Sequence, residues 1–129
     1  MGYYSHLWFK CTNDVFPDFY KVIKKVGLKN CIVNPKQNKK YTMFEFTNIK
    51  WYSDYPEVQA IDTFVDMCNQ EEPKVCYIRQ GENFDDIETA GCDPYELDCD
   101  YYVDLIVKGF DEGKEGFPIL QQTHPELVI

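Results

Sequence analysis

The thirty residues from position 41 to position 70 constrain the fold of this chain most strongly. They open with residues 41–52, a run rich in aromatic and β-branched side chains that favours a half-buried strand. Pro56 follows at a position typical of the first turn of a helix, where its missing N–H costs nothing. After it, apolar side chains recur at three- and four-residue steps: Val58, Ile61, Val65 and Cys68. This segment therefore predicts a strand that runs directly into an amphipathic helix.

The alternation of side chains within this strand is interrupted. Phe44 and Phe46 fall on one parity, whereas Tyr41, Ile49 and Trp51 fall on the other. A regularly pleated strand places alternate residues on opposite faces of its sheet. We therefore predict either a β-bulge near residues 45–48 or a strand that is buried on both faces.

Further strands and one more helix are predicted on either side of this segment. Alternation predicts a strand over residues 3–11, with aromatic side chains on both faces. A helix is predicted from Pro17 to Gly27, because apolar residues recur along one side of it. Short strands are predicted at residues 31–33, 74–80 and 99–107. Residues 82–98 are acidic and rich in turn formers, so they predict a loop with a single helical turn at residues 85–89.

The order of these elements predicts the fold class. Strand, helix, strand, strand, helix, strand is the order of ferredoxin-like domains, in which both helices cover one face of a sheet. We therefore predict an α+β, two-layer sandwich, ferredoxin-like β-α-β-β-α-β with an additional C-terminal strand. One domain is expected over residues 1–108. Residues 109–129 are expected to form an irregular tail packed on or near it.

Composition narrows the functional classes. A hydrophobic content of 44% argues against disorder even though the net charge is −9. The chain lacks an apolar run of membrane-spanning length and a signal-peptide pattern, so we expect it in the cytoplasm. Its six cysteines are then expected to be free thiols. Four of them lie in apolar runs and should pack as small apolar side chains, namely Cys11, Cys31, Cys68 and Cys76, whereas Cys92 and Cys99 flank a loop. No metal, cofactor or catalytic site is expected, because the two histidines, His6 and His124, stand in no known motif.

Charge is distributed unevenly along the chain. Residues 1–81 carry 11 Lys and Arg against 9 Asp and Glu, whereas residues 82–129 carry 2 against 13. Nine of these carboxylates form what we call the acidic segment: Glu82, Asp85, Asp86, Glu88, Asp93, Glu96, Asp98, Asp100 and Asp104. Asymmetry of this kind predicts an interaction surface for a partner with a basic groove, in which the carboxylates would mimic the phosphates of DNA.

Two other interpretations of the acidic segment stay open. It can be a solvated loop that keeps the protein soluble. It can also bind calcium through carboxylate oxygens, although the spacing of a calcium-binding loop is missing.

A second candidate surface is aromatic. Tyr4, His6 and Trp8 fall on one face of the first predicted strand. RNA-binding sheets stack bases on such side chains, but this chain has only one arginine and lacks the signature strand, so direct nucleic-acid binding is not expected. A covered face or a self-association patch, and with it a homodimer, is the alternative prediction.

Three stretches of the sequence resemble a known group of proteins. They are residues 1–5, MGYYS; residues 50–58, KWYSDYPEV; and residues 78–88, which contain IRQGE and DDIE. Together they resemble small, mostly uncharacterised bacteriophage proteins that begin Met-Gly-Tyr-Arg-Ser. Tyr4 departs from the arginine of that group. The resemblance implies a phage product in the bacterial cytoplasm, and by analogy an inhibitor of host defence of the anti-CRISPR type.

Taken together, the sequence predicts a non-enzymatic phage protein that blocks a host nucleic-acid-handling complex through the acidic segment. A structural or oligomerising module that uses Tyr4, His6 and Trp8 is the first alternative. A domain that binds a small ligand is the second.

Overall fold

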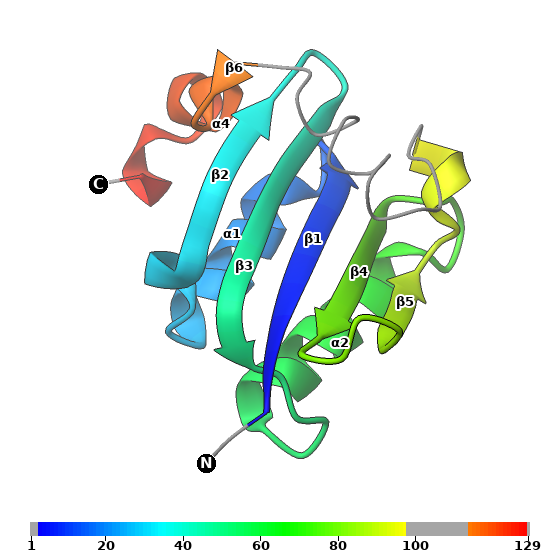
Figure 1. Cartoon of the computed structure of the whole chain (residues 1–129). Helices are drawn as coiled ribbons and strands as arrows, with labels where there is room; N and C mark the ends of the chain where they lie inside the picture. The colour runs from blue at the N-terminus through cyan, green and yellow to red at the C-terminus, as the bar shows by residue number, and fades with distance from the viewer. Residues whose placement is uncertain (1–2, 98–113, 129) are drawn as a thin grey trace.

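A computed structural model describes residues 3–97 and 114–128 of the 129-residue chain. Six antiparallel strands form one open sheet in the order β5-β4-β1-β3-β2-β6. Helices α1 and α2 lie side by side behind it in Figure 1, so the fold is α+β with two layers, as the sequence predicts. None of the helices among the described residues is both long and apolar enough to cross a membrane.

The elements follow the chain in this order: β1 (Tyr4–Thr12), α1 (Phe16–Lys25), the 3-10 helix η1 (Lys29–Cys31), β2 (Ile32–Gln37), β3 (Tyr41–Lys50), α2 (Pro56–Cys68), β4 (Val75–Gly81), β5 (Ile87–Gly91), η2 (Pro94–Leu97), β6 (Lys114–Glu115), α4 (Pro118–Thr123) and η3 (Pro125–Leu127). Both longer helices begin with proline in the first turn, as predicted.

The core lies between the sheet and its two helices. Phe9 of the central strand β1 is fully buried, and its ring contacts those of Phe19, Phe44, Phe46 and Tyr77 at centroid distances of 4.8–5.9 Å. Aromatic rings bury a large apolar area and prefer stacked or edge-on contacts, so this cluster supplies much of the stability of the fold. It joins β1 and β3 to both flanking elements, α1 and β4.

The predicted bulge is present in β3. Ser5 lies opposite Ile49, but Leu7 lies opposite Phe46, so β3 carries one extra residue at this point. Asn48 there adopts a positive φ of 56°. The extra residue reverses the parity, and Ile49 joins the same core as Phe46.

The structure corrects two predictions. Residues 85–89 do not form a helical turn; instead, β5 pairs with β4 as an edge strand. Its side chains are mostly exposed, so its sequence shows no apolar alternation to reveal it.

The second correction concerns the end of the chain. The tail that was predicted to be irregular contains α4 and η3, which bury Leu120 and Leu127 in the main core. The buried Gln37 accepts hydrogen bonds from the backbone of Ile119 and Leu120 and so holds the start of α4. The strand predicted at residues 99–107 lies outside the described residues.

Candidate protein-binding surface

The described part of the acidic segment follows one edge of the sheet. Glu82, Asp85 and Asp86 belong to the end of β4 and its loop, and Glu88 lies on the edge strand β5. Asp93 and Glu96 lie beyond the other end of β5, at η2. The three remaining predicted residues, Asp98, Asp100 and Asp104, lie outside the described residues.

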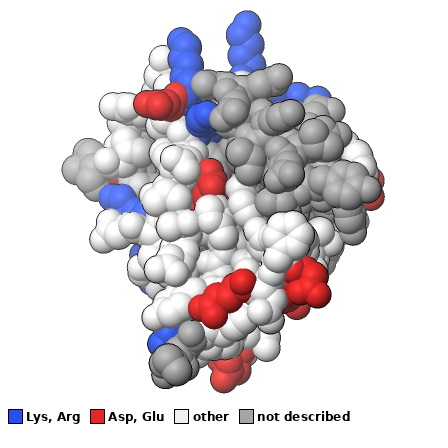
Figure 2. All heavy atoms as spheres, viewed as in Figure 1, with Lys and Arg blue, Asp and Glu red and all other residues white. Residues whose placement is uncertain are grey.

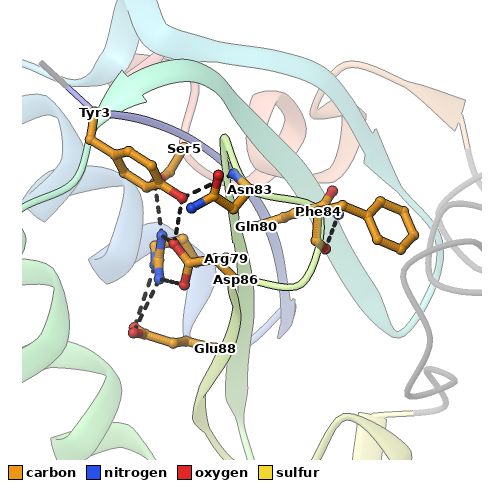
Figure 3. A network of polar contacts seen from close by, with 8 residues as sticks. All are labelled: Tyr3, Ser5, Arg79, Gln80, Asn83, Phe84, Asp86 and Glu88. Atoms are coloured by element: carbon orange, nitrogen blue, oxygen red, sulfur yellow. Dashed lines mark hydrogen bonds and ion pairs between the residues drawn. The ribbon is translucent and has the colours of Figure 1, made fainter.

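Two of these carboxylates form ion pairs with one buried cation, which offsets one of their two negative charges. The guanidinium of Arg79, which is only 7% exposed, donates to Asp86 Oδ1 at 2.7 Å and forms an ion pair with Glu88 Oε1 at 3.1 Å (Figure 3). It also donates to Ser5 Oγ at 3.0 Å, and Tyr3 donates its hydroxyl to Asp86 Oδ2 at 2.7 Å. These bonds satisfy a charge that would be costly to bury alone.

The electrostatics of this network agree with its geometry. Hydrogen bonds from Arg79 and Tyr3 lower the pKa of Asp86 below its usual value. Asp86 therefore stays ionised and paired, and it joins the sheet edge to the start of β1. Its role is structural, so it offers little charge to a partner.

The helix α2 adds carboxylates to this side of the molecule that were not among the predicted site residues. Asp62 accepts a hydrogen bond from Tyr77 of β4 at 2.6 Å. Burial raises the pKa of Asp62, and the nearby charges of Asp66 and Glu88 raise it further. The acidic side of α2 therefore lies beside β5. The sequence does contain a sign of this acidic surface, since α2 contains Asp and Glu but neither Lys nor Arg.

Charge is segregated in space as well as in sequence. We call residues 54–97, with α2, β4, β5 and η2, the acidic half; it holds twelve Asp and Glu against Lys74 and Arg79. We call residues 16–40, with α1 and β2, the lysine half; it holds seven lysines against Asp18. Because β5-β4 and β2-β6 form opposite edges of the sheet, the two halves lie on opposite sides of the molecule.

The face of the sheet opposite the helices carries side chains of both charges. In Figure 2, lysine side chains project at the end that carries the β2–β3 hairpin, and several acidic side chains lie toward the opposite end. Glu82, Asp85, Asp93 and Glu96 are exposed and form no ion pair with any residue in the described ranges. Their charge is therefore available to a partner.

An exposed aromatic side chain lies within the same hairpin. Phe84 is 87% exposed in the loop between β4 and β5, next to Asp85. The loop that presents it is ordered by Gln80 Nε2, which donates to the Phe84 carbonyl at 3.1 Å (Figure 3). Exposed aromatic rings surrounded by polar groups are typical anchors of protein interfaces.

The predicted aromatic face is less accessible than its sequence indicates. Tyr4, His6 and Trp8 do share the face of β1 that points away from the helices, but Trp8 is only 6% exposed. His6 stacks on Trp8 and contacts Glu45 Oε1 at 2.7 Å and Thr47 Oγ1 at 2.8 Å. Trp8 is thus part of the packed protein, which leaves Tyr4 and His6 as the accessible members of this set.

Metal sites and surface depressions are two further kinds of candidate site. Among the described residues, no three His, Cys, Asp or Glu side chains are placed to hold one metal ion. A shallow depression of about 520 Å³ lies between α1 and α2 and is lined mainly by apolar groups, including Val22, Phe64 and Met67.

Comparisons with protein-family models, with curated proteins and with solved structures find no match to this chain. The surface described above is therefore interpreted from its own geometry and chemistry.

Proposed function

We propose that this chain is an acidic, non-enzymatic protein that binds the nucleic-acid-binding surface of a host defence complex and blocks it. The opening and junction sequences that resemble small phage proteins support a phage origin and an anti-CRISPR type of action in the bacterial cytoplasm. The strand order β4-β1-β3-β2, with a helix after β1 and after β3, supports a ferredoxin-like core for this protein.

The observation that carries the proposal is the charge of the acidic half. This half contains twelve carboxylates and only two cations, and one of the cations, Arg79, forms ion pairs with Asp86 and Glu88. Concentrating like charges on one side of a domain opposes its folding, and a cationic partner relieves that repulsion. Basic grooves that bind nucleic acid are partners of this kind, because they are built to accept rows of phosphates.

Phe84 gives this surface an apolar anchor. A purely electrostatic contact would be weak in physiological salt, whereas a buried aromatic ring contributes binding free energy that salt does not screen. Asp85 flanks Phe84 in the loop. The loop therefore combines the two components that specific protein interfaces use, an apolar centre and a charged rim.

The test uses two variants of equal net charge. The first reverses three exposed carboxylates of the acidic half that form no ion pair with a described residue, Glu82→Lys, Asp85→Lys and Glu96→Lys. The control reverses three exposed carboxylates elsewhere, Asp18→Lys, Glu115→Lys and Glu126→Lys. Each variant changes the net charge from −9 to −3, so a difference between them reports the position of the charge.

The immobilised chain is incubated with bacterial host lysate, and the bound proteins are eluted with duplex DNA and, separately, with rising salt. We expect the unmodified chain and the control to retain a nucleic-acid-binding protein that DNA displaces. The first variant should bind it on the order of 100-fold more weakly, because three like-charge contacts replace attractive ones. Equal binding by the two variants, or a retained protein that DNA does not displace, would contradict the proposal.

A second experiment isolates the anchor. Phe84→Ala should weaken binding to the captured protein by about tenfold or more while leaving the melting temperature unchanged, because the ring is exposed in the free chain. Met67→Ala is the control, since Met67 is 65% exposed but lies between α1 and α2. Equal effects of the two substitutions would show that the β4–β5 loop is not the contact.

The alternative, self-association through Tyr4 and His6, is tested by sizing the chain at two concentrations. Trp8→Ala would report a core defect here because Trp8 is buried, so Tyr4→Ala is the informative variant. A concentration-dependent dimer that Tyr4→Ala dissociates would favour this alternative.

A further inference from the structure

Two cysteines that are distant in sequence lie in contact at the edge of the sheet. Cys76 lies on β4, and Cys92 directly follows β5. The Cys76 thiol forms a hydrogen bond with Cys92, and both side chains pack in one small cluster with Tyr41 and Leu97. From the sequence, Cys76 is expected only as a small apolar side chain and Cys92 only beside a loop, since a gap of 16 positions does not reveal the contact.

Gly91 is the reason that the two thiols meet. In the ladder, Cys76 lies opposite Gly91, and Cys92 donates its backbone N–H to the Val75 carbonyl at 3.0 Å. Position 92 would therefore share the helix-facing side with Val75 if the strand continued regularly. Gly91 has a φ of +83°, which turns the chain so that Cys92 joins Cys76 on the other face. A Cβ at position 91 would collide with the Val75 carbonyl.

The two thiols differ in a way that suits stepwise oxidation. Cys92 is half-buried, whereas Cys76 is only 2% exposed. The hydrogen bond from Cys76 lowers the pKa of Cys92, and thiolates are the reactive form of cysteine. Burial has the opposite effect at Cys11 and Cys68, where it raises the pKa of each thiol.

We propose that Cys76 and Cys92 form a redox site that reacts with hydrogen peroxide and closes to a disulfide. In the first step the Cys92 thiolate attacks one peroxide oxygen, the O–O bond breaks, and Cys92 becomes a sulfenic acid while the second oxygen leaves as hydroxide, which takes up a proton to form water. In the second step the Cys76 sulfur attacks the Cys92 sulfur, and the hydroxyl leaves as water. The two thiols lose two electrons in total, and the peroxide takes them up.

The disulfide would act on the hairpin that carries the acidic surface. A bond between positions 76 and 92 closes a loop that contains Glu82, Phe84 and Asp85. Such a crosslink restricts the unfolded chain and ties the far end of β5 to β4. Oxidation would therefore hold the partner-binding hairpin in its folded form.

The test is a peroxide titration of the whole chain followed by mass spectrometry without reduction. Trypsin releases residues 75–79 with Cys76 and residues 80–108 with both Cys92 and Cys99, so the experiment uses the Cys99→Ser background, in which the second peptide keeps one cysteine. We expect the two peptides to be joined, with a mass about 2 Da below their sum because the bond replaces two hydrogens. The melting temperature should rise on the order of 10 °C on oxidation.

Single variants separate the two steps. In Cys76→Ser, and in Cys76→Ala if the serine variant does not fold, Cys92 should stop at the sulfenic acid and be labelled by dimedone. In Cys92→Ser, Cys76 should not react. Cys31 is the internal control, because it is also half-buried. The proposal is wrong if no joined peptide forms, if Cys92 reacts no faster than Cys31, or if Cys92 pairs with another cysteine. An unchanged melting temperature would overturn the effect on the hairpin.

Discussion

The helices α1 and α2 pack side by side on one face of the sheet, and each begins with a proline in its first turn. Both bury an apolar stripe in the same core, through Phe19 and Ile23 on one helix and Ile61 and Val65 on the other. Their exposed sides differ. The helix α1 presents three lysines and one carboxylate, Lys21, Lys24, Lys25 and Asp18. The helix α2 presents Asp66 and the half-buried Glu57 and carries no cation.

This comparison separates what the fold requires from what it leaves free. Both helices have an apolar stripe, which packs on the sheet and stabilises the helix, and both have a proline in the first turn. Opposite charges on the solvent side are not needed for that purpose, since surface charges contribute little to stability. The surface charges of the acidic half and the lysine half are therefore free to serve binding.

The substitution with the largest expected effect on stability, Phe9→Ala, tests whether the acidic half and the lysine half share one core. Phe9 contacts Phe19 of α1 and also Tyr77 of β4, which bonds α2 through Asp62. Phe9→Ala should lower the free energy of unfolding by about 4 kcal/mol. Urea unfolding followed by fluorescence and by circular dichroism should show a single shifted transition. Two separate transitions would show that the halves unfold independently.

Arg79 is the buried cation of the acidic half, and its removal should have the next largest effect. Arg79→Met keeps most of the apolar volume but deletes the bonds to Asp86, Glu88 and Ser5. We expect a loss of about 2 kcal/mol in the free energy of unfolding, measured in urea. Lys74→Met is the control, since its ion pairs with Asp14 and Glu72 are exposed, and it should cost less than about 1 kcal/mol. Equal losses would mean that Arg79 has no special structural role.

Asp62 and Asp86 should give opposite dependences on pH. Burial raises the pKa of Asp62, so the folded state holds this proton more tightly, and stability falls as pH rises from about 4 through the folded pKa. Asp62→Asn removes this loss and keeps an acceptor for Tyr77, so the variant should gain stability relative to the unmodified chain between pH 4 and pH 7.

Asp86 has a lowered pKa, so its contribution is present above about pH 4 and is lost as pH falls through the folded pKa. Asp86→Asn should therefore be less stable than the unmodified chain at pH 7, with a difference that shrinks on acidification. Unfolding curves at several pH values between 3 and 7 measure both variants. The same slope for both would contradict the assigned charge environments.

The smallest expected effect compares single charges on the two helices. Asp66→Asn should raise the free energy of unfolding by about 0.5 kcal/mol at low salt, because the charge of Asp66 repels the nearby carboxylate of Asp62. Lys25→Gln should lower it by a similar amount, about 0.5 kcal/mol, because lysine stabilises the C-terminal end of α1. Both effects should fade in 1 M salt. Changes of the same sign in the free energy of unfolding of the two variants would contradict the electrostatic difference between the halves.

Local sequence patterns determined a large part of this protein. The apolar spacing in residues 56–68 predicted α2, and the broken parity in residues 41–52 predicted the bulge of β3 as one of two explanations. The carboxylates after position 81 marked an acidic stretch, but its sequence predicted a loop where the structure has β5. The helix and the bulge depend on contacts between near neighbours in the chain, which leave a periodic signal.

Only the tertiary structure decided the rest, because those features depend on contacts between distant residues. The strand β5 forms because β4 offers it a free edge and because Arg79 pairs with Glu88 across the two strands. The burial of Trp8, the contact of Cys76 with Cys92 and the approach of α2 to β5 likewise come from packing. The sequence gives the charge and polarity of each residue, but strand pairing and register in the folded protein determine which residues lie next to it across the sheet.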